Sequence, residues 1–136
     1  MPCREEETSV FWIETDQELA DAVASWENCV GLDTEFIRTD TFYPIPGLYQ
    51  VASADQVFLI DPLTIEDWQP FSTFLMDPKT LIVMHACQED LEMLNHHLKV
   101  QPTSVVDTQF AHAFTGVDYS LSYANLVRRT IGVELH

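Results

Sequence analysis

Apolar residues follow two different spacings along this chain, and each spacing predicts a different element. Short apolar runs bounded by glycine, proline or acidic residues are typical of strands. The capping-box pair Thr15 and Glu18 predicts a helix that begins there and runs to about Trp26. Apolar residues three or four positions apart predict further helices over residues 67–75, 89–98 and 108–114, and a last one that Ser120 or Ser122 caps and that ends near Arg129. The predicted strands cover residues 10–13, 30–37, 48–53, 57–60, 80–85 and 105–107.

The order of these elements predicts an α/β fold in one domain. Residues 48–53 and 57–60 have the spacing of a hairpin, whereas residues 39–47 are expected to be a loop because prolines interrupt them. The uninterrupted apolar run 80–85 is typical of a strand that is covered on both faces. We therefore expect a mixed sheet flanked by helices, antiparallel in its first three strands and parallel afterwards. Residues 1–9 are predicted to be a flexible acidic tail ahead of a domain over residues 10–136.

Two carboxylates interrupt the second predicted strand. Side chains alternate along a strand, so Asp33 and Glu35 point to one face and Thr34 to the other. Two neighbouring carboxylates on an apolar strand repel each other, and a hard divalent cation such as Mg²⁺ would offset that repulsion. The alternative is an exposed edge strand that carries two solvated acids.

A third acid is expected from the helix over residues 89–98. The apolar positions Leu91 and Leu94 place Asp90 at the edge of the buried stripe, and Glu89 and Glu92 nearer the solvent. Asp90 is therefore the carboxylate that we expect to face inward. The alternative is that all three acids only favour the first turn of a helix.

Other polar residues have simpler interpretations. His85 ends a buried strand, where the following loop would expose it beside the site, and Asp107 precedes a helix as an N-cap would. Cys87 is expected to be a small core residue, and Tyr119 and Tyr123 are expected to be core aromatics.

Charge and cysteine content limit the functional classes. The net charge is −16, with six lysine and arginine residues, so a basic stripe for nucleic acid is absent from the sequence. This absence argues against a nucleic-acid partner. The argument would be weaker if bound metal ions offset local charge or if a basic region lay outside this chain. Three widely spaced cysteines favour free thiols in a reducing cytoplasm, and no apolar stretch is long enough for a membrane helix.

Two motifs together resemble the ribonuclease D family, a group within the DEDD 3′–5′ exonucleases. These are Leu32-Asp33-Thr34-Glu35-Phe36 and His85-Ala86-Cys87-Gln88-Glu89-Asp90-Leu91-Glu92, which are similar to the first two exonuclease motifs of that family. The likeness runs through six segments in order, at residues 32–36, 43–50, 59–63, 85–92, 106–109 and 124–133.

The resemblance implies a ribonuclease H-like fold and an enzyme that removes nucleotides from RNA 3′ ends, tRNA precursors among them. Its chemistry would depend on two Mg²⁺ or Mn²⁺ ions about 3.5–4 Å apart. Asp33, Glu35 and Asp90 would be the metal-binding and catalytic acids. The resemblance also implies that the terminal nucleotide contacts three further residues, Phe36, Gln50 and His85.

The resemblance stops before the third motif of the family, which supplies a tyrosine and, four residues later, the fourth acid. We therefore expect a truncated chain with impaired catalysis. An exonuclease-like module that binds RNA or protein without cutting, and a metal-dependent hydrolase of another substrate, remain alternatives. A truncated sheet could also leave an exposed edge through which two copies pair.

Overall fold

The computed structural model describes residues 7–40, 42–116 and 120–135, which form one six-stranded sheet and five helices. Residues 1–6 of the predicted tail, including Cys3, and Tyr119 lie outside the described residues. The strands are β1 (Ser9–Ile13), β2 (Cys29–Ile37), β3 (Ile45–Ser53), β4 (Gln56–Ile60), β5 (Leu81–Met84) and β6 (Val105–Asp107). The helices are α1 (Asp16–Ser25), α2 (Gln69–Met76), α3 (Gln88–Leu98), α4 (Thr108–Ala113) and α5 (Tyr123–Ile131).

The sheet is mixed, in the order β1-β4-β3-β2-β5-β6. The pairs β2–β3 and β3–β4 are antiparallel, and the pairs β2–β5 and β5–β6 are parallel, as the order of elements predicts. The first strand differs from the prediction, because β1 pairs in parallel with β4. The crossover through α1 makes β1 parallel to β2, and β4 shares that direction because two antiparallel steps separate it from β2.

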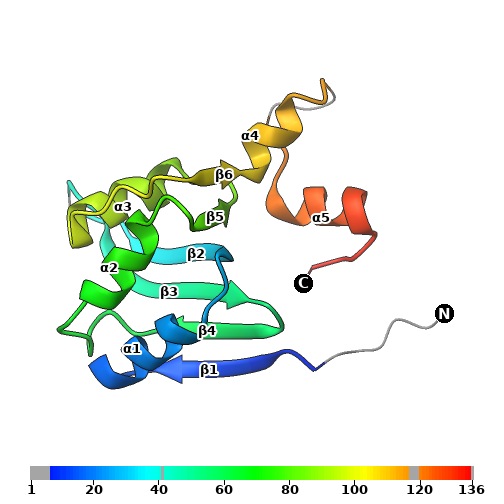
Figure 1. Ribbon diagram of the computed structural model, residues 1–136. Helices are drawn as coiled ribbons and strands as arrows, with labels where there is room; N and C mark the ends of the chain where they lie inside the picture. Colours follow the sequence, from blue (N-terminus) through cyan, green and yellow to red (C-terminus); the bar gives the residue numbers. More distant parts are fainter. Residues whose placement is uncertain (1–6, 41, 117–119, 136) are drawn as a thin grey trace.

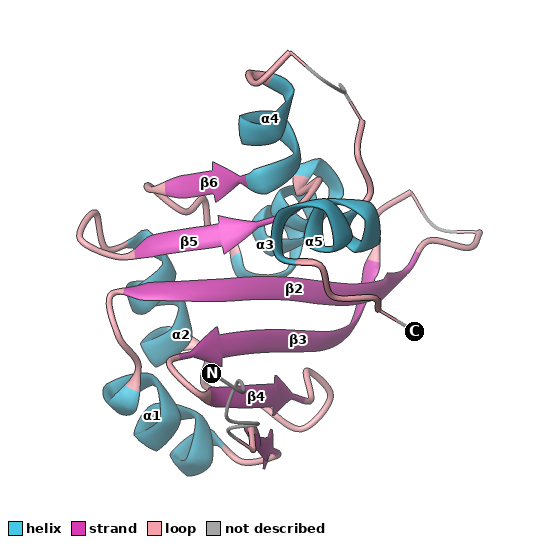
Figure 2. Ribbon diagram, turned by 90° about the vertical axis from the view of Figure 1, so that its right-hand side faces the viewer, coloured by secondary structure: helices cyan, strands magenta, loops and turns pink. Residues whose placement is uncertain are grey.

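Helices cover the two faces of the sheet unequally. Helices α1, α2 and α3 lie on one face, and α5 lies on the other (Figures 1 and 2). The core fills the space under α1, α2 and α3, where Val30, Leu32, Tyr49, Val51, Phe58, Ile60, Phe71, Leu75, Met93 and Leu94 are buried. The face toward α5, which we call the open face, carries no equivalent core in the described residues.

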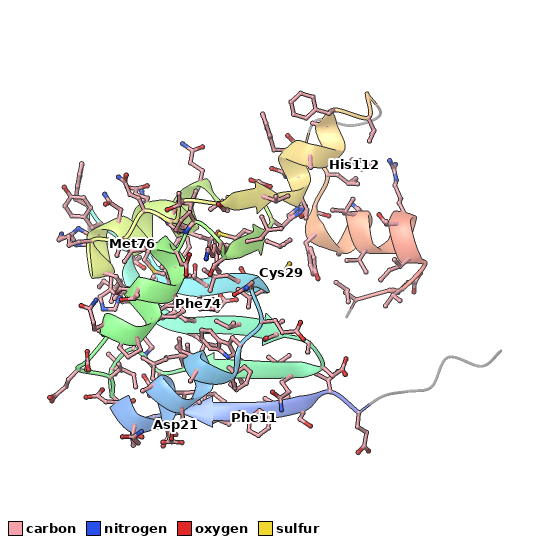
Figure 3. All side chains as sticks on the ribbon, in the orientation of Figure 1. Phe11, Asp21, Cys29, Phe74, Met76 and His112 are labelled. Atoms are coloured by element: carbon pink, nitrogen blue, oxygen red, sulfur yellow. The ribbon has the colours of Figure 1, made fainter. Side chains whose placement is uncertain are left out.

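Aromatic rings fill much of the core under α1 and α2. Trp26, just after α1, packs edge-on against Phe58, Phe71 and Phe74, with ring centroids 5.2–6.0 Å apart. Phe11 on the outer strand β1 stacks on Phe58 at 5.3 Å, so the cluster reaches the sheet edge (Figure 3). Such contacts join α1, α2 and β4 into one hydrophobic unit.

The loop predicted over residues 39–47 is shorter in the structure, and a bulge lies at the end of β2. Strand β3 begins at Ile45, so the prolines do not keep this segment out of the sheet. The register shifts between Glu35 and Phe36, and Pro46 pairs at that irregular point, where the missing N–H of proline is tolerated. A side chain at Gly47 would place its Cβ 3.3 Å from the Glu35 carbonyl oxygen, so glycine allows this close approach.

Two helix starts also refine the sequence pattern. Helix α2 begins at Gln69, because Pro70 takes one of the first helical positions, where no N–H is needed. Of the two candidate caps of the last helix, Ser122 accepts the Asn125 N–H, so α5 begins after it. No helix among the described residues is long and apolar enough to cross a membrane.

Asp107 is the N-cap of α4, as the sequence predicts, and it also binds the backbone ahead of α3. Its carboxylate accepts the N–H groups of Gln109 and Phe110 at the start of α4. It also accepts the N–H groups of Ala86 and Cys87, which lead into α3. Burial raises the pKa of Asp107, but these N–H groups outweigh it and hold that pKa below its usual range.

We predict that Asp107→Ala lowers the free energy of unfolding by about 2–4 kcal/mol at neutral pH, because a cap is lost and backbone donors are left unpaired. The loss is expected to shrink as pH falls through the lowered pKa of Asp107, where the parent protein loses the same stabilisation. Urea unfolding at several pH values measures both effects. Asp55→Ala is the control, since the Asp55 carboxylate forms no hydrogen bond within the described chain; an equal loss in both variants would contradict the prediction.

Candidate functional site

The pair Asp33 and Glu35 lies on the open face of a central strand. Along β2, Leu32 and Thr34 are buried toward α3, whereas Asp33 and Glu35 are exposed on the opposite side. Strand β2 sits between β3 and β5, so the alternative of an exposed edge strand is wrong. The two carboxylates are nevertheless in contact with solvent, which leaves them accessible to a ligand.

Asp90 faces inward, as the helix periodicity predicts. It lies in the first turn of α3 and is 8% exposed, and its Oδ1 accepts a hydrogen bond from the hydroxyl of Thr34. Burial raises the pKa of Asp90, the Thr34 hydrogen bond opposes that rise, and the nearby charge of Asp33 adds to it. Asp90 is therefore an acid held against the back of β2 at an electrostatic cost.

The other two acids of this helix face outward. Glu89 is exposed, and Glu92 forms an ion pair with Arg38, with 3.0 Å between Oε2 and Nη2. Thr34 is a residue of the candidate site that the sequence pattern does not identify, although its hydroxyl binds Asp90. Its position between two acids, on the opposite face of the strand, is the signal that could have indicated a partner for a buried acid.

A cavity of about 410 Å³ lies beside Asp33 on the open face. Gln50 lines it directly opposite Asp33 in the β2–β3 register, and Tyr123 of α5 is a further lining residue. Gly31 and Ala52 are paired across β2 and β3, and they line the cavity on the side of the sheet. Because glycine has no side chain and alanine only a methyl group, they leave room for the cavity. The remaining lining residues are Leu32, Val51, Val57, Val83, Met84, His85 and Thr108.

His85 lines the cavity while both of its ring nitrogens bond to protein groups. Its Nε2 lies 2.8 Å from the Leu121 carbonyl oxygen, so Nε2 carries a proton and donates it. Its Nδ1 lies 2.8 Å from Oγ1 of Thr108. His85 therefore joins the end of β5 to the segment that leads into α5.

Three of the remaining predicted residues occupy different environments. Tyr123 is 56% exposed and lies edge-on to His85 at 5.6 Å, so the expectation of a core aromatic is wrong. Phe36 packs against the core instead of lining the cavity. Cys87 is buried as predicted, and burial, followed by the charge of Asp107, raises its thiol pKa to about 11, which disfavours thiolate chemistry.

The donor chemistry of these acids fits a divalent metal ion. Carboxylate oxygens are the ligands that Mg²⁺ and Mn²⁺ prefer, and the repulsion between Asp33 and Asp90 is what a bound cation would relieve. The described residues nevertheless bring no three His, Cys, Asp or Glu side chains together in a group that could hold a metal. Asp33 and Glu35 approach from one face of β2 and Asp90 from the other.

The chain matches a sequence model of a 3′–5′ exonuclease family over residues 10–136. It is 42% identical to ribonuclease D of Pseudomonas paraeruginosa over 128 residues, which are 93% of this chain and 34% of that protein. It is 40% identical to ribonuclease D of Escherichia coli over 126 residues, which are 90% of this chain and 33% of that protein. The chain thus spans about a third of the length of these curated relatives.

Solved structures show the same architecture. The crystal structure of Escherichia coli RNase D, described as an exoribonuclease involved in structured RNA processing, superposes with a TM-score of 0.85 at 39% identity, over 92% of this chain and 34% of that one. The Trypanosoma brucei RNase D complex with RNA U12 superposes with a TM-score of 0.83 at 25% identity, over 93% of this chain and 48% of that one. The mixed sheet is therefore shared with these proteins.

We predict that Asp90→Asn raises the free energy of unfolding at neutral pH in the presence of a chelator. Asparagine keeps an oxygen that accepts the Thr34 hydroxyl, but it removes a charge that burial and Asp33 disfavour. An acid whose pKa is raised on folding destabilises the folded state fully above that raised pKa. The gain should therefore shrink as pH falls toward the ordinary Asp pKa of about 3.9 and vanish below about pH 3, where Asp is protonated in both states. Thermal unfolding across this pH range measures the gain; a gain that persists in acid would contradict its electrostatic origin.

Proposed function

Because the chain belongs to the 3′–5′ exonuclease family, we propose that it forms part of an enzyme that removes nucleotides from RNA 3′ ends by metal-assisted hydrolysis of phosphodiester bonds. The observation that carries this proposal is the position of Asp33 and Glu35 on an exposed face of a central strand, where Asp33 lines a cavity and lies close to the buried Asp90. A buried acid close to another carboxylate, as Asp90 is to Asp33, is expensive to maintain and is typical of functional sites.

In this proposal Asp33, Glu35 and Asp90 hold two divalent ions, Mg²⁺ or Mn²⁺. Such ions, when bound, lower the pKa of an attacking water and neutralise charge on the leaving 3′ oxygen. Thr34 orients Asp90 through its hydrogen bond. Gln50, directly opposite Asp33, and His85, whose ring lines the same cavity, would contact the terminal nucleotide.

RNA is the substrate class that this proposal favours. A related RNase D from Trypanosoma brucei has been solved with RNA, which supports an RNA strand as the ligand of this fold. Bound metal ions would offset part of the net charge of −16 where the strand approaches. The proposal extends to tRNA precursors as substrates, to a cytoplasmic location and to pairing of two copies through an exposed sheet edge.

A second candidate is a module that binds RNA or protein without cutting. The observation in its favour is that the described residues do not gather three metal-binding side chains into one group. Against it stands the cost of keeping Asp90 buried next to Asp33, which a scaffold without metal would not need.

We predict that Asp33→Asn abolishes metal-dependent trimming of an RNA 3′ end by the whole protein, with a loss of at least about 10²–10³-fold in rate, the cost of removing one electrostatic stabiliser of a transition state. A 5′-labelled single strand with a free 3′ hydroxyl, followed on a denaturing gel with Mn²⁺, reports the rate. Asp55→Asn is the matched control, because it removes an exposed carboxylate in the β3–β4 turn. Unchanged trimming by Asp33→Asn would overturn the proposal.

We also predict that the whole protein binds Mn²⁺ in titration calorimetry, and that Asp33→Asn and Glu35→Gln each weaken this binding at least about tenfold, because each removes an anionic oxygen ligand. Glu89→Gln is the control, since Glu89 is exposed on the adjacent helix. Equal heats for all four proteins would favour the module that binds without cutting.

A further inference from the structure

The loop between β2 and β3 carries aromatic rings that the core does not use. It begins directly after β2, three residues beyond Glu35, and projects past the end of that strand (Figure 2). Phe42 is 83% exposed and Tyr43 is 46% exposed. Exposing a phenylalanine side chain to this extent forgoes the stabilisation that burial would give, so the loop is a candidate contact surface.

The rings of this loop are held in place by neighbouring residues. The Tyr43 ring stacks on His96 of α3, with centroids 3.9 Å apart and an interplanar angle of 7°. Phe42 lies edge-on to Tyr43, with centroids 4.9 Å apart and an angle of 86°. Pro44 is buried directly after them, which anchors the backbone at this point. We call Phe42, Tyr43 and His96 the aromatic platform.

A cation lies beside the aromatic platform. Arg38 starts the loop and pairs with Glu92, which is one helical turn before His96 on the same side of α3. The ion pair directs Arg38 to the side of α3 that also carries His96, and the Arg38 side chain remains 37% exposed. Only six lysine and arginine residues occur in the sequence, so a cation at this point is informative.

These observations indicate stacking as the mode of recognition. Single-stranded nucleic acids are bound by exposed aromatic rings on which unpaired bases stack, together with cations that contact the backbone. Within this chain, whose net charge is −16, few cations are available for backbone contacts, so stacking would supply a larger share of the contribution that this chain makes to the affinity. Rings that are already ordered lose little entropy when a base binds them.

We propose that the aromatic platform binds an unpaired base of the RNA strand whose 3′ end lies at Asp33 and Glu35, with Arg38 beside the backbone. The placement of the 3′ end rests on the proposed exonuclease function, whereas the stacking itself does not. The enzyme would then hold single-stranded RNA at two points, the acids on the open face and the platform beyond the end of β2. A base that is paired in a duplex could not stack there.

Binding is tested in the whole protein with Asp33→Asn, so that the RNA is not cut, by fluorescence anisotropy of a labelled single-stranded oligonucleotide. Phe42→Ala is expected to weaken binding about 5- to 100-fold, the range for loss of one base–aromatic stack. Phe42→Trp is expected to retain affinity, and Phe42→Leu to weaken it as alanine does. Phe110→Ala is the matched control, since Phe110 is 65% exposed and lies edge-on to Phe114 at 5.0 Å on α4.

A second measurement locates the stacked base. Oligonucleotides with 2-aminopurine at successive positions from the 3′ end should show one or two quenched positions, and Phe42→Ala should abolish that quenching while Phe110→Ala leaves it unchanged. Equal affinity of Phe42→Ala and its parent, or full affinity of Phe42→Leu, would overturn the stacking proposal. A Phe42→Ala change that alters oligomeric state or thermal stability but not RNA binding would assign the loop to a polypeptide contact and overturn it as well.

The two proposals fail in different ways. If metal-dependent trimming is absent with Asp33 intact, but RNA binding still requires Phe42, the exonuclease function is wrong and the platform is right. If trimming occurs and requires Asp33, but Phe42→Ala binds RNA as well as its parent, the platform is wrong and the function is right.

Discussion

The two-residue period of β2 is the constraint on which the candidate site depends. One central strand must bury Leu32 and Thr34 under the helices and, because of the same pleat, must expose Asp33 and Glu35 on the open face. Thr34 then becomes the residue that reaches Asp90 through the back of the strand. Two acids in front and one behind are thus positioned by a single strand, and a one-residue shift of its register would invert the arrangement.

The sequence predicts those parts of the fold that depend on local periodicity, and fails where distant segments meet. Asp90 could be selected from three acids because helical phase alone decides which one faces inward. The pairing of β1 with β4 could not be selected, because two crossovers determine it together. The exposure of Tyr123 cannot be predicted for a related reason, since a tyrosine on an amphipathic helix is buried only if a second layer covers it.

Proline positions show the same limit at smaller scale. Pro46 disfavours a strand when the chain is considered alone, yet a bulge in the partner strand removes the need for its N–H. The hydrogen bonds that position the start of α3 could not be predicted either. The sequence predicts that Asp107 caps α4. Its hydrogen bonds to the N–H groups of Ala86 and Cys87 cannot be predicted in this way, because they arise only from the pairing of β5 with β6.

Helix α5 is attached to the sheet less firmly than the helices on the other face. In this helix, which the structure describes throughout, no residue is fully buried, although Leu126 and Val127 are half-buried. The segment before it is held by the buried Leu121, whose carbonyl oxygen accepts hydrogen bonds from His85 and Gln109. The floor of the cavity, by contrast, belongs to the sheet. The cavity is therefore built from two cooperative units of unequal stability, and α5 can exchange its amide hydrogens through local opening while the sheet beneath it stays folded.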